Sequence, residues 1–295
     1  MGDTVIWDGV NADYDYDHVD NWVLNGPPVS TDAVIFPPMA HADGTDVDGD
    51  DYDAALLASF TIMDGCYVDI GVATTGAPVY LQIDADAVTL EPAGTILLDI
   101  DNCAAISVRD CKSTSLAGTY GLYLIGTGNT ILNVLSTNTG DISIAALAGE
   151  TAAFTTISIA GGDVTIGSGV TMTTLNVSGG TVINSSAATT VIVYGGTYTH
   201  NGGAVGALNC IGGTTYINAT ETITVINVHA DATIDFSKDM RTKTVSLPFN
   251  VAKGATIRDP YDVVTSMVVD CEKCGLDEIT LVSAKNKRFT LGTVG

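Results

Sequence analysis

The sequence predicts an all-β protein wound into a solenoid, or β-helix, and three observations favour this fold class. Gly-Gly pairs recur at 161–162, 179–180, 195–196 and 212–213, at intervals of 18, 16 and 17 residues. A triplet of the form apolar, any residue, apolar precedes each pair, and two further triplets follow without glycines. Units of about 17 residues are too short to bury an apolar face alone, so stacked copies must share one core.

The six triplets align in columns. Their first and third residues are apolar in every copy, whereas their middle residues are polar in five copies of six. Period-two alternation is typical of a strand with one buried face. The predicted core ladder comprises Ile157, Ile159, Leu175, Val177, Val191, Val193, Leu208, Cys210, Ile226, Val228, Val245 and Leu247.

A second short strand follows each glycine pair, for example at 163–166 and 181–184. The glycines are expected to form the corners of the coils, because glycine adopts a positive φ without steric penalty. A β-sandwich is the alternative, since regularly spaced short strands also fit that fold. In-phase columns favour the solenoid. The predicted repeat corners are Gly161, Gly162, Gly179, Gly180, Gly195, Gly196, Gly212 and Gly213.

Less regular copies precede the repeats, at 87–90, 95–98, 105–108, 131–134 and 141–144. Both ends of a stack expose strand edges and need caps. The predicted organisation is an acidic N-terminal cap or attachment module at 1–54 and a solenoid body at 55–260, most regular over 151–250. A C-terminal cap or docking segment is expected at 261–295.

The charge follows the same division. The chain has 34 Asp and Glu against 11 Lys and Arg, a net charge of -23. Twenty acids and no Lys or Arg lie in residues 1–108, whereas residues 238–295 hold nine basic and seven acidic side chains. Nucleic acids and anionic membranes are recognised through cationic surfaces, so neither is an expected partner. The N-terminus also lacks the basic and apolar regions of a secretory signal, which predicts assembly in the cytoplasm.

Six cysteines, at 66, 103, 111, 210, 271 and 274, are expected to be reduced and mostly buried. Cys210 lies in an apolar column and should be inert. Cys271 and Cys274 form a lone C-x-x-C. A structural zinc site needs four ligands, and no second pair or suitably spaced histidines accompany this one, so ordinary turn cysteines are the expectation.

The segment from residue 4 to residue 36 contains a spaced motif of aromatic, acidic and glycine residues. It resembles a cap module found ahead of β-solenoid repeats in autotransporter-like bacterial surface proteins and in bacteriophage virion proteins. An Asp- and Tyr-rich insert at 11–17 stands where that family commonly has a Gly- and Ser-rich one. The matching residues are Trp7, Asp8, Gly9, Asn21, Trp22, Pro27 or Pro28, Asp32 and Val34 to Phe36.

Two tryptophans can plug the open end of an apolar core and keep their indole N–H groups near polar partners. Trp7 and Trp22 are therefore expected to be structural plugs, with sugar stacking as the alternative. A dense carboxylate loop follows the motif, and Ca²⁺ takes six to eight oxygen ligands of this kind. The alternative is a solvated acidic loop, and no other cofactor is expected. The Ca²⁺ candidates are Asp43, Asp46, Asp48, Asp50, Asp51 and Asp53.

No catalytic residues are expected. Glycan hydrolysis and lyase chemistry need paired carboxylates, or carboxylates beside a basic residue. Residues 113–237 contain no Lys or Arg. Asp231 and Asp235 are the nearest pair of acids there, and both are expected on the coil exterior without a basic neighbour.

The resulting hypothesis is a non-enzymatic structural protein of a bacteriophage virion that decorates the capsid or forms a head fibre. Its expected partners are identical chains, in a homo-oligomer such as a trimer, and other virion proteins such as the major capsid protein. The alternatives are a tail fibre, spike or surface adhesin that binds a receptor or glycan, and a glycan-degrading enzyme. Sugar stacking would be favoured if Tyr194, Tyr198 and Tyr216 lined one outer strip.

Overall fold

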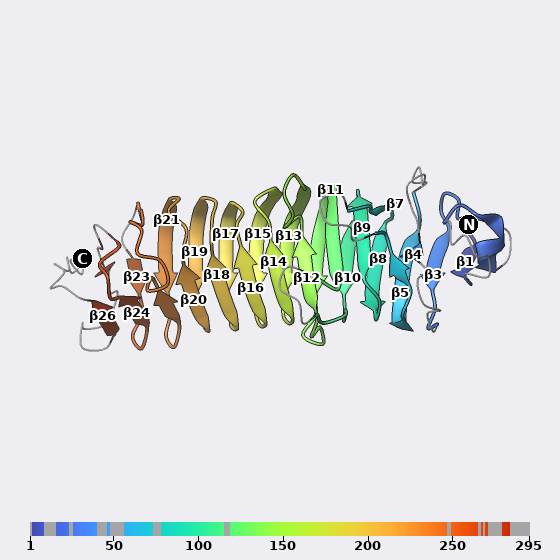
Figure 1. The fold of residues 1–295 in the computed structure, drawn as a ribbon. Coiled ribbons are helices and arrows are strands. Elements are labelled where there is room, and N and C mark those ends of the chain that lie inside the picture. The colour runs from blue at the N-terminus through green and yellow to red at the C-terminus, as the bar shows by residue number, and fades with distance from the viewer. Residues whose placement is uncertain are drawn as a thin grey trace.

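The chain forms an elongated rod of stacked coils, with β1 near one end and β26 near the other (Figure 1). The computed structural model describes residues 2–8, 16–23, 26–39, 46–47, 56–72, 78–114, 119–246, 249–264, 267, 269–270 and 279–283. The described strands form two hydrogen-bonded ladders that run along the rod. The described residues contain no helical segment with the length and hydropathy that a membrane crossing requires.

The first ladder pairs each strand with its equivalent in the next coil. From the N-terminal end its strands are β1 (Thr4–Trp7), β3 (Ala33–Phe36), β5 (Ser59–Cys66), β8 (Ala87–Pro92), β10 (Ala105–Val108), the end of β11 (Leu122–Val134), β13 (Ala152–Ile159), β15 (Val170–Val177), β17 (Ala188–Val193), β19 (Val205–Cys210), β21 (Ile223–Val228), β23 (Phe249–Val251) and β25 (Val269–Asp270). The short strand β2 (Trp22–Val23), preceded by the 3-10 helix η1 (Val19–Asn21), pairs antiparallel with β1.

The second ladder is formed by the strands that follow the coil corners along the chain. Its strands are β4 (Asp46–Val47), β6 (Asp69–Ile70), β7 (Leu81–Asp84), β9 (Ile96–Asp101), the start of β11, β12 (Asp141–Ile144), β14 (Asp163–Ile166), β16 (Thr181–Asn184), β18 (Thr197–His200), β20 (Thr214–Ile217), β22 (Thr233–Asp235), β24 (Thr256–Asp259) and β26 (Thr280–Ser283).

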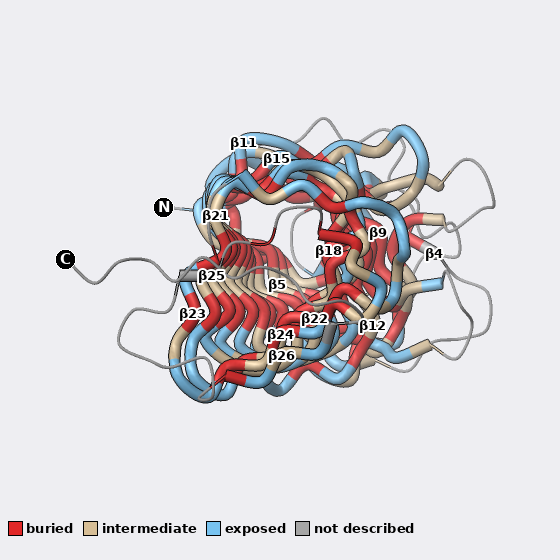
Figure 2. The backbone as a smooth tube through the Cα atoms, turned by 90° about the vertical axis from the view of Figure 1, so that its left-hand side faces the viewer, coloured by how far each residue is buried: buried red, intermediate tan, exposed pale blue. Residues whose placement is uncertain are grey.

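Strand register explains why this sequence builds a common core. In the first ladder each inward residue sits directly over its equivalent, so alternate residues of every strand meet in continuous columns. Viewed down the rod, buried positions line the interior and exposed positions the outside (Figure 2). One such column is formed by Val5, Val34, Phe60, Val88, Ile106, Leu132, Ile157, Leu175, Val191, Leu208, Ile226 and Phe249, all buried.

The β-solenoid prediction is confirmed, and the sandwich alternative is wrong. A sandwich is built from antiparallel strands. Here the successive strands of the described repeats, for example β13 with β15 and β15 with β17, pair in parallel. The five irregular upstream copies are also strands of these ladders, in β8, β9, β10, β11 and β12, with only Thr95 outside its strand.

One predicted rung of the core ladder is wrong. The sequence pattern placed Val245 and Leu247 over Ile226 and Val228, but the structure places Phe249 and Val251 there. Val245 instead forms an isolated bridge with Ile223 and is only partly buried. The cause is the long connection between β22 and β23, which delays the next coil. Leu247 lies outside the described residues.

The parallel pairing continues beyond the predicted ends of the body. On the N-terminal side β3 pairs with β5 and β1 pairs with β3, which ties residues 4–36 to the coils after residue 55. On the C-terminal side β26 pairs with β24 across residue 260. The basic residues Lys285, Lys287 and Arg288 near the C-terminus lie outside the described residues.

The second glycine of each pair supplies the corner. Gly162, Gly180, Gly196 and Gly213 all have a positive φ, between 65° and 73°. They also stack on one another: a Cβ built on Gly196 would lie 2.6 Å from the carbonyl oxygen of Gly180. Two independent constraints therefore select glycine at this corner, the backbone angle and the closeness of the neighbouring coil.

The two constraints can be separated by mutation. Gly149 has a φ of +89°, but a Cβ there would meet nothing within 4 Å. We expect Gly149→Ala to lower the free energy of unfolding by about 1 kcal/mol, the cost of a left-handed alanine. Gly196→Ala adds the clash with the backbone below and should cost about 3 kcal/mol. Urea denaturation measures both, and equal losses would contradict the stacked corner.

Candidate functional site

The N-terminal end of the core is closed by an aromatic cluster. Trp7 is the last rung of an inward column, and its ring stacks on Phe36 with centroids 5.4 Å apart. Trp22 lies opposite Trp7 in β2 and packs edge-on against it at 5.0 Å. The Trp22 indole Nε1 donates to the Tyr16 carbonyl oxygen at 2.8 Å. Trp7, Tyr16, Trp22 and Phe36 are all buried, which is the geometry of a plug and leaves no open ring face for a sugar.

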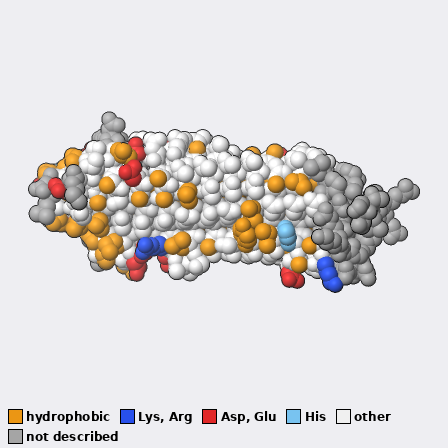
Figure 3. Space-filling model, turned by 180° about the vertical axis from the view of Figure 1, so that it is seen from behind, with side chains coloured by type: hydrophobic (Ala, Val, Ile, Leu, Met, Phe, Trp, Pro, Cys, Tyr) orange, Lys and Arg blue, Asp and Glu red, His pale blue; other side chains and the backbone are white. Residues whose placement is uncertain are grey.

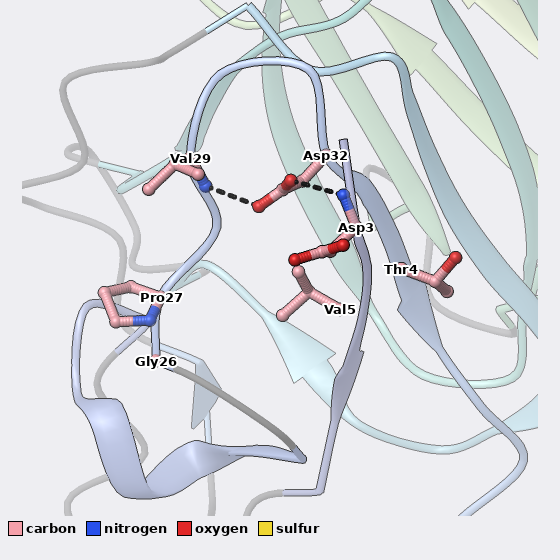
Figure 4. A pocket seen from close by; sticks show the side chains of 7 residues that line it. All are labelled: Asp3, Thr4, Val5, Gly26, Pro27, Val29 and Asp32. Carbon is pink, nitrogen blue, oxygen red and sulfur yellow. Dashed lines mark hydrogen bonds between the residues drawn. The ribbon is translucent and has the colours of Figure 1, made fainter. Parts of the chain in front are cut away.

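The buried carboxylate of Asp32 fixes the start of the chain to this plug. Its Oδ1 accepts a hydrogen bond from the backbone N–H of Asp3 at 2.9 Å, and its Oδ2 accepts one from Val29 at 2.9 Å (Figure 4). A cavity of about 290 Å³ lies beside it, lined by Asp3, Thr4, Val5, Gly26, Pro27, Val29 and Asp32. Because both Asp32 oxygens are engaged by backbone donors, this carboxylate holds the loop in place.

The remaining motif residues flank the plug. Asn21 is fully buried, and its carbonyl oxygen accepts the Asp8 N–H at 3.0 Å. Pro27 lines the cavity beside Asp32 and is half-buried, whereas its neighbour Pro28 is buried. Gly9 lies outside the described residues. The structure thus gathers the described motif residues at one end of the rod.

The side chains of the Ca²⁺ candidates all lie outside the described part of the chain. Asp43, Asp48, Asp50, Asp51 and Asp53 lie outside the described residues, as does the side chain of Asp46. Among the residues that the structure describes, no group of three or more His, Cys, Asp or Glu side chains has the arrangement of a metal site.

Four of the six cysteines are described, and all four are buried and free: Cys66, Cys103, Cys111 and Cys210. Burial raises the pKa of the Cys111 and Cys210 thiols to about 12, so both stay protonated near neutral pH and are poor nucleophiles. Cys271 and Cys274 lie outside the described part of the chain.

Asp231 and Asp235 were both expected on the exterior of the coils, but only Asp231 lies there. Asp231 is exposed, but Asp235 is buried and accepts the Ser237 N–H at 2.7 Å. The Arg258 Nε lies 3.6 Å from the Asp235 Oδ2. The expectation of an exterior Asp235 without a basic neighbour is therefore wrong. The neighbour was missed because Arg258 is one coil away in space and 23 positions away in sequence.

A polar network inside the solenoid was also missed. Asn184, Tyr198 and His200 point into the core of the second ladder and are fully buried. The Asn184 Nδ2 donates to the Tyr198 hydroxyl at 3.1 Å, and that oxygen lies 3.2 Å from the His200 Nδ1. Asn184 and His200 occupy a column with Ile166 and Ile217, so aligning the second strands as well as the first would have located them.

The tyrosines do not line one strip, so that part of the sugar-stacking expectation is wrong. Tyr198 is buried in the core. Tyr216 lies in the second ladder with the Lys238 Nζ 3.4 Å above its ring centroid. Tyr194 follows the first ladder and is 51% exposed.

The fold and these features define the protein as a β-solenoid with an aromatic plug at its N-terminal end. Comparison with protein-family models, with curated proteins and with solved structures found no match for the chain.

The role of Asp32 as an anchor predicts a specific loss of stability. We expect Asp32→Ala to lower the free energy of unfolding by about 2 kcal/mol, because two part-buried backbone donors lose a charged acceptor. Asp3→Ala is the matched control, since the Asp3 side chain is exposed and the anchor uses only its backbone N–H. Chemical denaturation followed by tryptophan fluorescence reports on the plug directly, and equal effects of the two variants would refute the anchor.

Buried His200 predicts a pH dependence. Burial lowers its pKa from 6.5 to about 4, and the Gly203 backbone and Glu221 oppose this shift without reversing it. The unfolded chain therefore binds a proton that the folded chain does not between these values, so stability falls as pH decreases. The full loss from pH 7 to below pH 4 is about 3 kcal/mol.

His200→Leu removes the titrating group and matches the apolar Ile217, which follows His200 in the column. The variant should lose this part of the pH dependence and keep the contribution of the carboxylates. Urea denaturation at several pH values between 7 and 4 measures the difference between the two proteins. Parallel pH profiles for wild type and variant would contradict a neutral, buried His200.

Proposed function

We propose that the chain is a non-enzymatic structural protein of a bacteriophage virion, most simply a capsid decoration or head-fibre protein on the particle exterior. The observation that carries the proposal is the contrast between the ends of the rod and its middle. The plug and 36 of the 45 charged side chains lie in residues 1–108 and 238–295, whereas the coils between these segments repeat one structural plan.

The middle of the rod suits a spacer. Its inward columns make a continuous core, and few charged side chains lie on its outer surface, as the described part of one face shows (Figure 3). In residues 151–237 the only charged side chains are Asp163, Glu221, Asp231 and Asp235. A neutral flank of this kind imposes little charge repulsion between identical chains, which supports the proposed homo-oligomer.

The N-terminal module supports the virion assignment through its resemblance to caps of β-solenoid virion and surface proteins. The described plug adds a physical reason for the motif, since an open solenoid end would expose both apolar columns and strand edges. Partners proposed on this basis are identical chains and the major capsid protein.

Three of the described carboxylates, those of Asp32, Asp235 and Asp239, do not favour a catalytic role. Asp32 and Asp235 are buried and already accept backbone hydrogen bonds. The Asp239 carboxylate binds the Arg241 side chain and the buried Lys243 Nζ, and these contacts hold its pKa well below its usual range. Each of these acids is satisfied by the fold, whereas hydrolysis needs a pair facing a substrate.

Copy number tests the proposal. Quantitative mass spectrometry of purified particles, referenced to the major capsid protein, should find on the order of hundreds of chains per particle, and electron microscopy should show rods on the capsid. Fewer than about a dozen chains located at the tail would overturn the decoration assignment in favour of a tail fibre. Absence from purified particles would overturn the virion assignment altogether.

A further inference from the structure

A groove of about 300 Å³ lies on the outside of the first ladder, near the middle of the rod. Its lining comes from four successive coils, and its polar side-chain groups are amides and hydroxyls. The residues around it are Asn133, Val134, Leu135, Ser158, Ile159, Ala160, Asn176, Ser178 and Tyr194. None of them carries a charge.

The groove arises from residue size within one stacked column. Leu135, Ala160, Ser178 and Tyr194 each follow a first-ladder strand, and each donates its N–H to the coil before it. Two small residues therefore lie between two large ones. With coils about 4.8 Å apart, Leu135 and Tyr194 stand about 14 Å apart and wall the groove at its two ends.

The amides beside the groove have free hydrogen-bonding capacity. Asn133, Ser158 and Asn176 belong to a second outward column. Further along this second column, Asn227 donates to Asn209 at 2.6 Å and Asn250 donates to Asn227 at 2.6 Å, so these side chains satisfy one another. Ile192 interrupts that ladder. On the groove side, Asn176 donates only to Ser158, at 3.3 Å, and the Asn133 amide makes no hydrogen bond within the described residues.

We propose that this groove binds an uncharged saccharide. An exposed aromatic ring packs against the C–H face of a sugar ring, and neighbouring amides and hydroxyls exchange hydrogen bonds with its hydroxyl groups. Tyr194 supplies the ring, and Asn133, Asn176 and Ser178 supply the polar groups. The volume lies at the lower end of the range for small-molecule sites, which suits one or two sugar units.

Charge complementarity selects an uncharged ligand. The protein is strongly acidic overall, so an anionic glycan would be repelled, and the groove offers no carboxylate to a cationic one. The nearest charged residue along the Leu135 column is Arg109, which pairs with Glu91 at 3.0 Å. This binding activity goes beyond the proposed structural role and is independent of it.

Saturation-transfer NMR on the purified full chain tests the site with a defined panel of probes: maltotriose, chitotriose, a galactose disaccharide and a rhamnose disaccharide. An oligogalacturonate serves as the anionic comparison. We expect signal from at least one uncharged probe and none from the anionic probe. Titration of the positive probe then gives a Kd for each variant.

Tyr194→Ala should weaken binding at least about tenfold, Tyr194→Phe should retain it, and Asn176→Ala should weaken it about fivefold. Tyr67→Ala is the matched control, because Tyr67 is 56% exposed and does not line the groove. Circular dichroism establishes that each variant is folded.

Three results would overturn the proposal: no saccharide signal from any uncharged probe, equal affinity in Tyr194→Ala, or a wild-type dimer in ultracentrifugation that Tyr194→Ala dissociates. The last result would assign the groove to a second copy of the chain. None of them bears on the number of chains per virion, so the structural role and the saccharide site fail separately.

Discussion

The structure depends on one constraint: each coil must stack in register on the next. A single coil buries almost nothing, whereas parallel pairing sets equivalent residues about 4.8 Å apart and gives each inward side chain two like neighbours. The column through Val191 and Leu208 shows the result, since both are buried although each coil contributes only a few apolar residues. The constraint is also local, so every irregularity in the sequence becomes a feature at a definite height along the rod.

The distinctive features of the molecule are consequences of this stacking. A column must end somewhere, and at the N-terminal end Trp7 terminates one on the ring of Phe36. A corner repeated in every coil brings backbone against backbone, which selects glycine at 196. Small residues at 160 and 178 leave a hollow between larger ones. A buried hydroxyl and imidazole, at 198 and 200, occupy core positions and are tolerated because Asn184 lies beside them.

Stacking also explains which parts of the structure the sequence predicts. The columns of the regular coils follow from period-two alternation at a constant interval, and the corners follow from the glycine pairs. The pattern fails where the interval changes: a long connection after β22 moves the next rung from Val245 to Phe249, and nothing in a local triplet marks the delay. Contacts between coils join residues that are far apart in the sequence, as with Asp235 and Arg258, so a local pattern does not predict them. The motif at 7–36 locates the plug, but the contribution of Tyr16 required the fold.

In-register stacking is the central claim, and cross-linking of neighbouring coils tests it most directly. Thr174 and Thr190 are paired outward positions in β15 and β17, and Ile192 is two residues out of register with Thr174. With cysteines at 174 and 190, a short thiol-to-thiol cross-linker should join the pair within one chain, as mapped by mass spectrometry. Cysteines at 174 and 192 should react far more slowly. Preferential cross-linking of 174 with 192 would contradict the register on which the core, the corners and the groove depend.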